Sequence, residues 1–191
     1  AWLNKTICLV VKPKKMSQEE AEEIVASFDN VLLMSSEEEL LETFISLVDD
    51  ADVLSGWNLE GFDIPYIVNR IARQLGKDYT RKLCHWGQFP KKRNYEHYGN
   101  TQETFDLVGR VHLDYLQLYR KYTYHEMHSY SLDAISEHEL DEKKVAYEGT
   151  LDQLYNNDFK KFIEYNIQDT DLLRKLDDKL QFIDLANVLA H

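Results

Sequence analysis

The sequence has 191 residues, which is enough for one domain with a sizeable core. Apolar residues make up 43% and glycine and proline are scarce, so collagen-like repeats and long flexible linkers are excluded. The net charge of −12 by itself argues against a nucleic-acid partner. Cys8 and Cys84 match no zinc spacing and predict reduced thiols in an intracellular protein, and no apolar run is long enough to cross a membrane.

The charge is distributed unevenly along the chain. No Lys or Arg lies between Lys15 and Arg70, whereas residues 70–93 hold many basic residues and one acid, Asp78. On charge alone, a solvated helix and loop explain this segment as well as a nucleic-acid surface does. The acidic total does not exclude DNA, because an enzyme that uses metal ions on DNA needs acids at its centre.

The first half of the chain alternates predicted strands and helices. Residues 17–20 and 36–39 each place a Ser three positions before a Glu, which is the capping box that begins a helix. The first of these helices ends near Phe28. A third helix starts near Ile64 and ends near Gly76, a residue suited to a C-terminal cap. Short apolar runs predict strands at residues 6–11, 31–34 and 53–57, the first of them buried.

The second half begins with a polar, aromatic and irregular stretch at residues 83–109, with a hairpin expected around Gly99. Residues 110–115 alternate, with Val111, Leu113 and Tyr115 on one face, as in a half-buried strand. A short helix is expected at residues 131–138. Asn157 or Asp158 caps a long final helix, whose apolar positions recur with a 3.6-residue period through Leu180. Strands alternating with helices predict an α/β layer architecture.

Residues 56–66 (GWNLEGFDIPY) end an apolar strand at a turn and place Asp63 where a helix begins. A carboxylate at such a junction can face a cleft. Taken alone, the more common explanation is that Asp63 caps the helix and Pro65 occupies its first turn.

Tyr165 and Asp169 lie four residues apart on the final helix, so both project from one face. Burying a carboxylate is costly unless a cation or a hydrogen-bond donor meets it, and Lys160 and Lys161 lie two turns back. A divalent metal is one answer. A solvated Asp169 at the edge of the core, with Tyr165 as a plain core residue, is the other.

Together the two segments resemble the second and third exonuclease motifs of family B DNA polymerases. Asn58, Phe62 and Asp63 match Asn-x-x-x-Phe-Asp, and Tyr165 and Asp169 match Tyr-x-x-x-Asp. The likeness runs from about Val31 to the C-terminus. Its order and spacing are similar to those of the T-even-type phage polymerases at residues 56–70, 113–119, 130–132 and 146–149.

The resemblance implies that residues 1–191 are a partial 3′→5′ proofreading exonuclease domain with a ribonuclease-H-like fold, a mixed sheet flanked by helices. It also implies hydrolysis of the 3′-terminal phosphodiester of DNA with two divalent ions, Mg²⁺ or Mn²⁺, about 4 Å apart. Asp63 and Asp169 would be metal ligands. Tyr165 would orient the attacking water, in the subclass that uses Tyr rather than His at this position.

The family's first motif, an Asp-x-Glu at the end of the first strand, is missing. The Asp residues at 49–52 belong to a helix end and not to a strand. We expect the motif to precede this sequence in the parent protein. With two of the four carboxylates and the first strand gone, we expect an incomplete sheet, weak metal binding and negligible hydrolysis.

The resemblance also assigns DNA contacts. Asn58 and Phe62 either position the DNA end or only shape the turn. In the hairpin region, basic side chains would contact phosphates without reading sequence, and the residues expected to do so are Lys91, Lys92 and Arg93. The expected partners are a single-stranded DNA 3′ end or a primer–template and the polymerase domain of the same parent chain. No membrane is expected, and the cytoplasm of a bacterial host is the expected location.

Two further features carry less. Asp114 lies on a strand near the site in the resembling proteins, although a polar strand residue is the more common explanation. His125 and His128 lie three residues apart, but no Cys or acid completes a zinc ligand set, so we expect a surface pair. The alternatives are a non-catalytic DNA-binding or structural module of a replication protein, and a stand-alone exonuclease acting on RNA.

Overall fold

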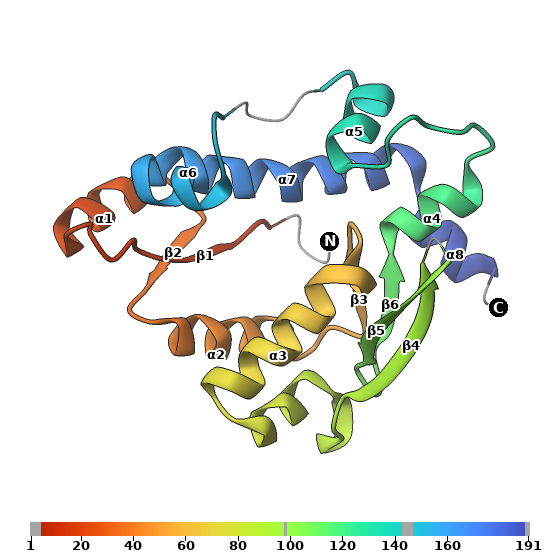
Figure 1. The fold of residues 1–191 in the computed structure, drawn as a ribbon, viewed down its shortest axis with the longest axis horizontal. Helices are drawn as coiled ribbons and strands as arrows, with labels where there is room; N and C mark the ends of the chain where they lie inside the picture. Colours follow the sequence, from red (N-terminus) through yellow and green to blue (C-terminus); the bar gives the residue numbers. More distant parts are fainter. Residues whose placement is uncertain (1–4, 98, 143–146, 190–191) are drawn as a thin grey trace. The chain divides into compact units, whose positions relative to one another are not determined.

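The computed structural model of the chain describes residues 5–97, 99–142 and 147–189. These residues divide into two compact units, each assembled from segments far apart in the sequence. The first unit comprises Ala1–Leu40 and Met127–Gln181, and the second comprises Leu41–Glu126 and Phe182–His191. Figure 1 labels the helices and strands of both units.

The first unit opens with a parallel pair of short strands joined by a helix. Strand β1 (Cys8–Val11) pairs with β2 (Val31–Met34), and α1 (Gln18–Val25) lies between them in the sequence. The predicted capping box of α1 is present, because the Ser17 hydroxyl accepts the Glu20 N–H and the Glu20 carboxylate accepts the Ser17 N–H. The prediction of a buried first strand is only partly correct, since Val10 alone is buried in β1.

The long helix α7 (Phe159–Leu180) is the central packing element of the first unit. It packs against β1, α1, α5 (Leu132–Leu140) and α6 (Leu151–Asn157), and Figure 1 shows α5 and α6 along it. The core of this contact consists of Val10, Ala21, Val31, Phe159 and Ile163. Helix α6 was not predicted, although Thr150 and Gln153 form a capping box that signals it.

The second unit contains a second parallel pair. Strand β3 (Val53–Gly56) pairs with β6 (Val111–Asp114), so that Gly56 lies opposite Asp114 at the carboxyl ends of both strands. Helix α3 (Ile64–Gln74) follows β3 after a short π-helical turn, η1 (Leu59–Asp63). The predicted end of α3 is confirmed, with Gly76 at a φ of +95° directly after it.

Helix α2 (Glu37–Leu47) precedes β3 and has Leu41 and Ile45 buried. Its predicted capping box is altered. The Glu39 N–H donates to the Ser36 hydroxyl, but the Glu39 carboxylate accepts the N–H of Ser35 instead of that of Ser36. The helix therefore begins as predicted, with its reciprocal hydrogen bond shifted by one residue.

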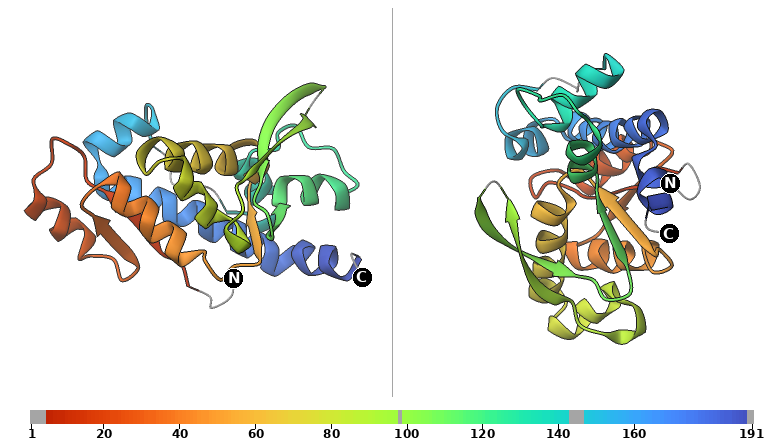
Figure 2. Two further views of the ribbon diagram at one scale, coloured as in Figure 1. Left: turned by 90° about the horizontal axis from the view of Figure 1, so that it is seen from below. Right: turned by 90° about the vertical axis from the view of Figure 1, so that its right-hand side faces the viewer.

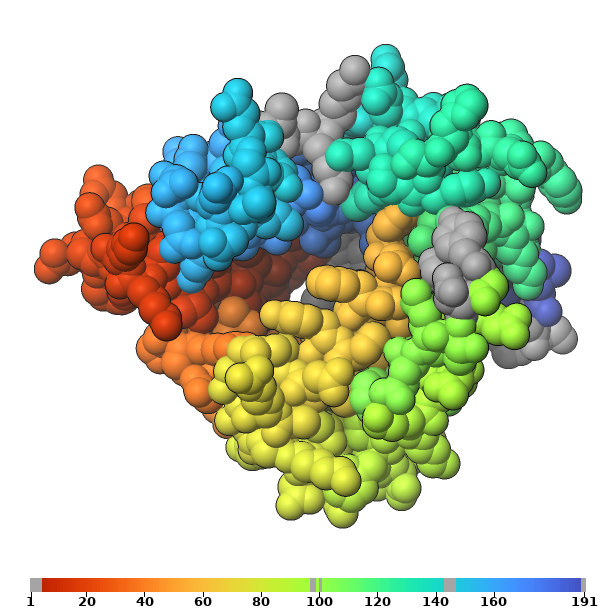
Figure 3. All heavy atoms as spheres, viewed as in Figure 1, coloured from red at the N-terminus to blue at the C-terminus, as the bar shows by residue number. Residues whose placement is uncertain are grey.

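The region expected to be irregular is more ordered than predicted. Two 3₁₀ turns, η2 (Lys77–Leu83) and η3 (His85–Gly87), lead into an antiparallel hairpin of β4 (Lys91–His97) and β5 (Asn100–Asp106). The hairpin prediction around Gly99 is confirmed, and Figure 2 shows its two green strands. Helix α3 packs against both η2 and β5, and together they form the yellow and green surface in Figure 3.

The predicted inward face at residues 110–115 is only partly correct. Tyr115 is buried as expected, but Val111 is 52% exposed and Asp114, on the opposite face, is 5% exposed. Tyr115 is also the first residue of a helix, α4 (Tyr115–Tyr122), which was not predicted. The long helix α7 ends at Leu180, where its apolar pattern ends, and Gln181 after it adopts a left-handed conformation. It is not the final helix as expected, since α8 (Phe182–Leu189) follows it. The Phe182 ring packs against three tyrosines of α4: Tyr115, Tyr119 and Tyr122.

The α/β composition with flanking helices is therefore confirmed. The strands of the described residues form three two-stranded sheets, β1–β2, β3–β6 and β4–β5, rather than the single mixed sheet that was expected. No helix in the described ranges combines the length and the apolar character that a membrane span requires.

Candidate functional site

Asp63 is positioned by the turn between β3 and α3. Asn58 begins the turn in the left-handed conformation, which Asn tolerates better than most residues, and the Ile64 N–H closes it by donating to the Leu59 carbonyl. Asp63 stands directly before α3, but its φ and ψ are helical and its side chain makes no capping hydrogen bond. The explanation of Asp63 as a simple helix cap is therefore wrong.

The Asp63 carboxyl group faces the end of β3. A Cβ added at Gly56 would lie 3.7 Å from Asp63 Oδ2. Burial, and to a smaller degree the charge of Asp114, raises the pKa of Asp63 from 3.8 to about 6, against the opposing hydrogen bond from its own N–H. No Lys, Arg or His within the described ranges pairs with this carboxylate. A divalent cation would supply the missing positive charge, and a carboxylate oxygen is a ligand that such cations accept.

Asp114 supports the turn instead of facing an open site. Its Oδ1 accepts the Leu116 N–H at 3.0 Å and so caps α4, while its Oδ2 accepts the Glu60 N–H at 3.1 Å. Burial raises the pKa of Asp114, and these backbone hydrogen bonds act in the opposite direction. Both oxygens are thus committed to the backbone, a role that only the tertiary pairing of β3 and β6 reveals.

Glu60 is the centre of an ion-pair network on the same turn. Its side chain is 14% exposed and contacts the Arg93 guanidinium through Oε2 and His112 Nδ1 through Oε1, the latter at 3.2 Å. Arg93 also donates from Nε to Asp106 Oδ1 at 2.7 Å. No sequence pattern predicted this network, because its members come from three segments that are far apart along the chain.

The three basic residues expected to bind DNA differ in environment. Lys91 is exposed at the start of β4. Lys92 pairs with Glu103 across the hairpin at 2.7 Å, with both side chains exposed. Arg93 is held by Glu60 and Asp106. Lys91 and Lys92 are therefore the more available of the three to an external phosphate.

Phe62 and Tyr66 form an exposed aromatic pair beside Asp63. Phe62 is 61% exposed, and its ring stacks on that of Tyr66 with centroids 5.7 Å apart and planes inclined by 11°. The Phe62 N–H donates to the Asn58 carbonyl at 3.0 Å, so the turn holds the backbone that carries the ring. An exposed stacked pair of this kind can receive a flat aromatic ligand.

Tyr165 and Asp169 lie on one face of α7 and both are half-buried. The Tyr165 ring meets that of Tyr147 edge-to-face at 5.1 Å. Asp158 caps the helix as predicted, through the Lys161 N–H. Tyr165 and Asp169 belong to the first unit and Asp63 to the second, so the convergence of the two acids stays a prediction.

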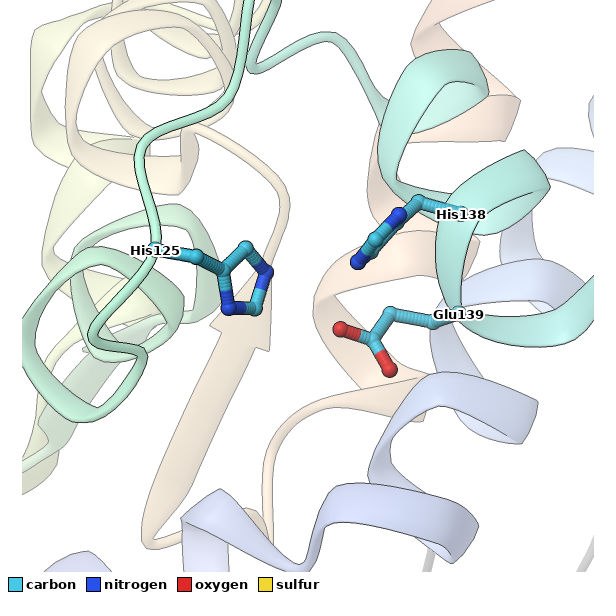
Figure 4. Close-up of side chains that lie close together, drawn as sticks. All are labelled: His125, His138 and Glu139. Atoms are coloured by element: carbon cyan, nitrogen blue, oxygen red, sulfur yellow. The ribbon is translucent and has the colours of Figure 1, made fainter.

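The histidines expected at the surface are found there, since His125 and His128 are both exposed. The Nε2 atom of His125 lies 3.3 Å from the Tyr119 hydroxyl. Figure 4 shows His125 on the segment that follows α4, and His138 and Glu139 on α5. The Glu139 carboxylate accepts a hydrogen bond from Lys179 of α7 at 3.1 Å.

Comparison with known proteins places the chain in a family. The protein family described as "DNA polymerase family B, exonuclease domain" matches residues 4–135. This chain belongs to the exonuclease domains of family B DNA polymerases.

The chain is similar to two phage enzymes described as DNA-directed DNA polymerases. It is 33% identical to that of Enterobacteria phage T4 over 83% of the chain, and 34% identical to that of Escherichia phage RB69 over 90%. It is also 32% identical to the DNA polymerase delta catalytic subunit of Bos taurus over 56% of the chain and 10% of that protein. The chain spans about a fifth of the phage polymerases, 18% and 20% of their lengths.

Proposed function

We propose that this chain is the 3′→5′ proofreading exonuclease domain of a DNA-directed DNA polymerase, with residues 1–191 forming part of a ribonuclease-H-like domain. The observation that carries the proposal is the Asp63 carboxyl group. It is half-buried, makes no helix cap, and has its pKa raised to about 6 with no cation paired to it in the described residues. A carboxylate kept in that state at the end of a strand suits metal binding.

In this proposal Asp63 and Asp169 hold divalent metal ions, Mg²⁺ or Mn²⁺. When bound, the two ions supply activation of a water molecule and stabilisation of the leaving 3′-oxygen. Tyr165 orients the attacking water through its hydroxyl group, and its edge-to-face contact with Tyr147 holds the ring. The backbone donors that hold Asp114 keep η1, and with it Asp63, in place.

The DNA contacts follow from the exposed side chains of the second unit. The Phe62–Tyr66 pair offers a surface on which a terminal base can stack, and Asn58 shapes the turn beneath it. Lys91 and Lys92 contact phosphates of the single-stranded 3′ end or of the primer–template. The polymerase domain of the same parent chain is the protein partner that this arrangement implies.

The sequence contains no Asp-x-Glu on a strand before Asp63, so we propose that this chain alone hydrolyses DNA weakly or not at all. The test compares two proteins on a 5′-labelled single-stranded oligonucleotide with Mg²⁺ or Mn²⁺. One is this chain, and the other is this chain extended at its N-terminus by a strand that carries Asp-x-Glu. We expect stepwise shortening from the 3′ end only in the extended protein, and its loss on addition of a chelator.

Substitution locates the site in the same assay. Asp63→Ala and Asp169→Ala should each abolish hydrolysis by the extended protein, whereas Asp133→Ala, at an exposed acid of α5, should not. Full activity in Asp63→Ala would reject the assignment. DNA binding without hydrolysis in the extended protein would favour the alternative, a non-catalytic module of a replication protein.

A further inference from the structure

The hairpin and the turn that carries Asp63 are joined by a guanidinium group. Arg93 lies on β4, and its Nη2 pairs with Glu60 of η1 while its Nε donates to Asp106 at the end of β5. Arg presents its donors as a rigid planar fork, so one side chain can fix two carboxylates relative to each other. Arg93 thereby ties both hairpin strands to the turn.

The Glu60 end of this bridge is the better-buried one. The Glu60 side chain is 14% exposed and that of His112, which contacts its other oxygen, is 6% exposed. The Glu60 N–H is held by Asp114, so the residue is fixed through both its backbone and its side chain. A partly buried, hydrogen-bonded ion pair of this type is screened less by solvent than a surface pair.

A second contact links the same two elements. A Cβ at Gly61 would lie 2.9 Å from the hydroxyl of Tyr95 on β4, closer than real Cβ contacts allow. The Tyr95 hydroxyl in turn donates to Gln102 of β5 at 2.9 Å. The hairpin therefore approaches η1 at adjacent residues, Glu60 and Gly61, and the absence of a side chain at Gly61 permits that approach.

We propose that Arg93 is a positioning residue, which sets the place of Asp63 by holding the turn through Glu60. Glu60 and Asp63 are both members of the five-residue turn η1, so a displacement of β4 moves the turn that bears the acid. The consequence for hydrolysis rests on the proposed function. The coupling of β4 to the turn η1 through Arg93 and Glu60 does not rest on it, since that coupling depends only on contacts inside the second unit.

The first test measures hydrogen exchange at the η1 amides of this chain, unmodified and as Arg93→Gln, Glu60→Gln and the double variant. We expect each single substitution to speed exchange at the Glu60 and Phe62 amides on the order of fivefold, and the double variant to add little more. Lys92→Gln is the matched control, because it breaks the adjacent Lys92–Glu103 pair within the hairpin and leaves η1 protected. Equal exchange in Arg93→Gln and Lys92→Gln would overturn the proposal.

The second test measures hydrolysis by the extended protein. Arg93→Gln should lower kcat with little change in KM, Arg93→Lys should recover part of it, and Lys92→Gln should raise KM alone. A rise in KM alone for Arg93→Gln would show a phosphate contact and overturn the positioning role. If exchange is coupled but no extended protein hydrolyses DNA, the coupling stands and the proposed function fails. Hydrolysis without coupled exchange would instead support the proposed function and overturn the coupling.

Discussion

Asp63 and Asp114 lie close enough for the charge of Asp114 to add to burial in raising the pKa of Asp63. The two acids lie at the carboxyl ends of the paired strands β3 and β6, where Gly56 stands opposite Asp114. Only Asp114 has its oxygens committed to backbone donors of other residues, the amides of Leu116 and Glu60. The pair thus divides into a supporting acid and one whose charge is left uncompensated.

Asp63→Asn should stabilise the chain at neutral pH. Because the folded pKa of about 6 exceeds the ordinary value of 3.8, the folded state retains a proton that the unfolded state has released between these values. The contribution of Asp63 to the free energy of unfolding is therefore most favourable below about pH 4. It falls as the pH rises to about 6 and stays lower above that pH. In denaturant unfolding, the free energy of unfolding of Asp63→Asn should exceed that of the unsubstituted chain by about 1–2 kcal/mol at pH 7.5. The difference should vanish near pH 4.

The matched control is Glu96→Gln, at an exposed acid of β4, which should leave the free energy of unfolding within ~0.5 kcal/mol at both pH values. Added Mn²⁺ should stabilise the unsubstituted chain more than Asp63→Asn. A pH-independent gain in Asp63→Asn would show that the charge is not its cause.

Arg110→Met should destabilise the second unit. Arg110 is buried, and its guanidinium donates to the carbonyls of Leu83, Val48, Ala51 and Asp49, which would be left without that donor. We expect a loss of about 2–4 kcal/mol in urea unfolding. Arg110→Lys keeps the charge but not the fork, and should recover only part of the loss. If Arg110→Met and the unsubstituted chain have nearly equal free energies of unfolding, these hydrogen bonds do not stabilise the fold.

Gly61→Ala should destabilise the turn by about 1–2 kcal/mol, because the new Cβ would meet both the Asn58 side chain and the Tyr95 hydroxyl. Asn58→Gly removes one of these obstacles and suits the left-handed backbone at that position. The double variant should therefore lose less than the sum of the two single variants, as measured by thermal unfolding. Strict additivity would mean that the two positions do not interact.

Asp114→Ala should cost about 2–3 kcal/mol in denaturant unfolding, since it removes the cap of α4 and the acceptor of the Glu60 N–H together. Asp114→Asn keeps one carbonyl acceptor and should cost less. Ser131→Ala, which removes a single cap from α5 in the first unit, gives a reference of about 1 kcal/mol. If Asp114→Ala loses no more stability than Ser131→Ala, the hydrogen bond from the Glu60 N–H to Asp114 does not stabilise the fold.

Sequence reasoning succeeded where the signal is local. The capping box at Ser17, strand β2 and the glycine after α3 depend on residues within a few positions of one another. It failed at β6, where apolar alternation was expected to point Val111 inward. The face opposite Val111 turns inward instead, because Asp114 and His112 contact Glu60, and no local pattern encodes a contact more than fifty residues away.

The candidate site shows the same division. The motif spacing located Asp63, Tyr165 and Asp169 as candidates, while the exonuclease family was confirmed by comparison. The spacing could not show that Asp63 makes no cap, nor that Arg93 is tied to Glu60 and Asp106. Those facts depend on how the hairpin docks on the turn, which is a property of tertiary packing.

Because η1 is a π-helical turn, the number of residues in the turn helps to determine where Asp63 lies. The turn fits one more residue between its closing hydrogen-bonded groups, Leu59 and Ile64, than an α-helical turn would. Deleting a residue there would leave the four-residue spacing of an α-helical turn between Leu59 and Ile64, and would change the direction in which Asp63 projects toward the end of β3. The number of residues between Asn58 and Asp63 therefore fixes the position of Asp63, in addition to the side-chain contacts of Glu60 and Gly61.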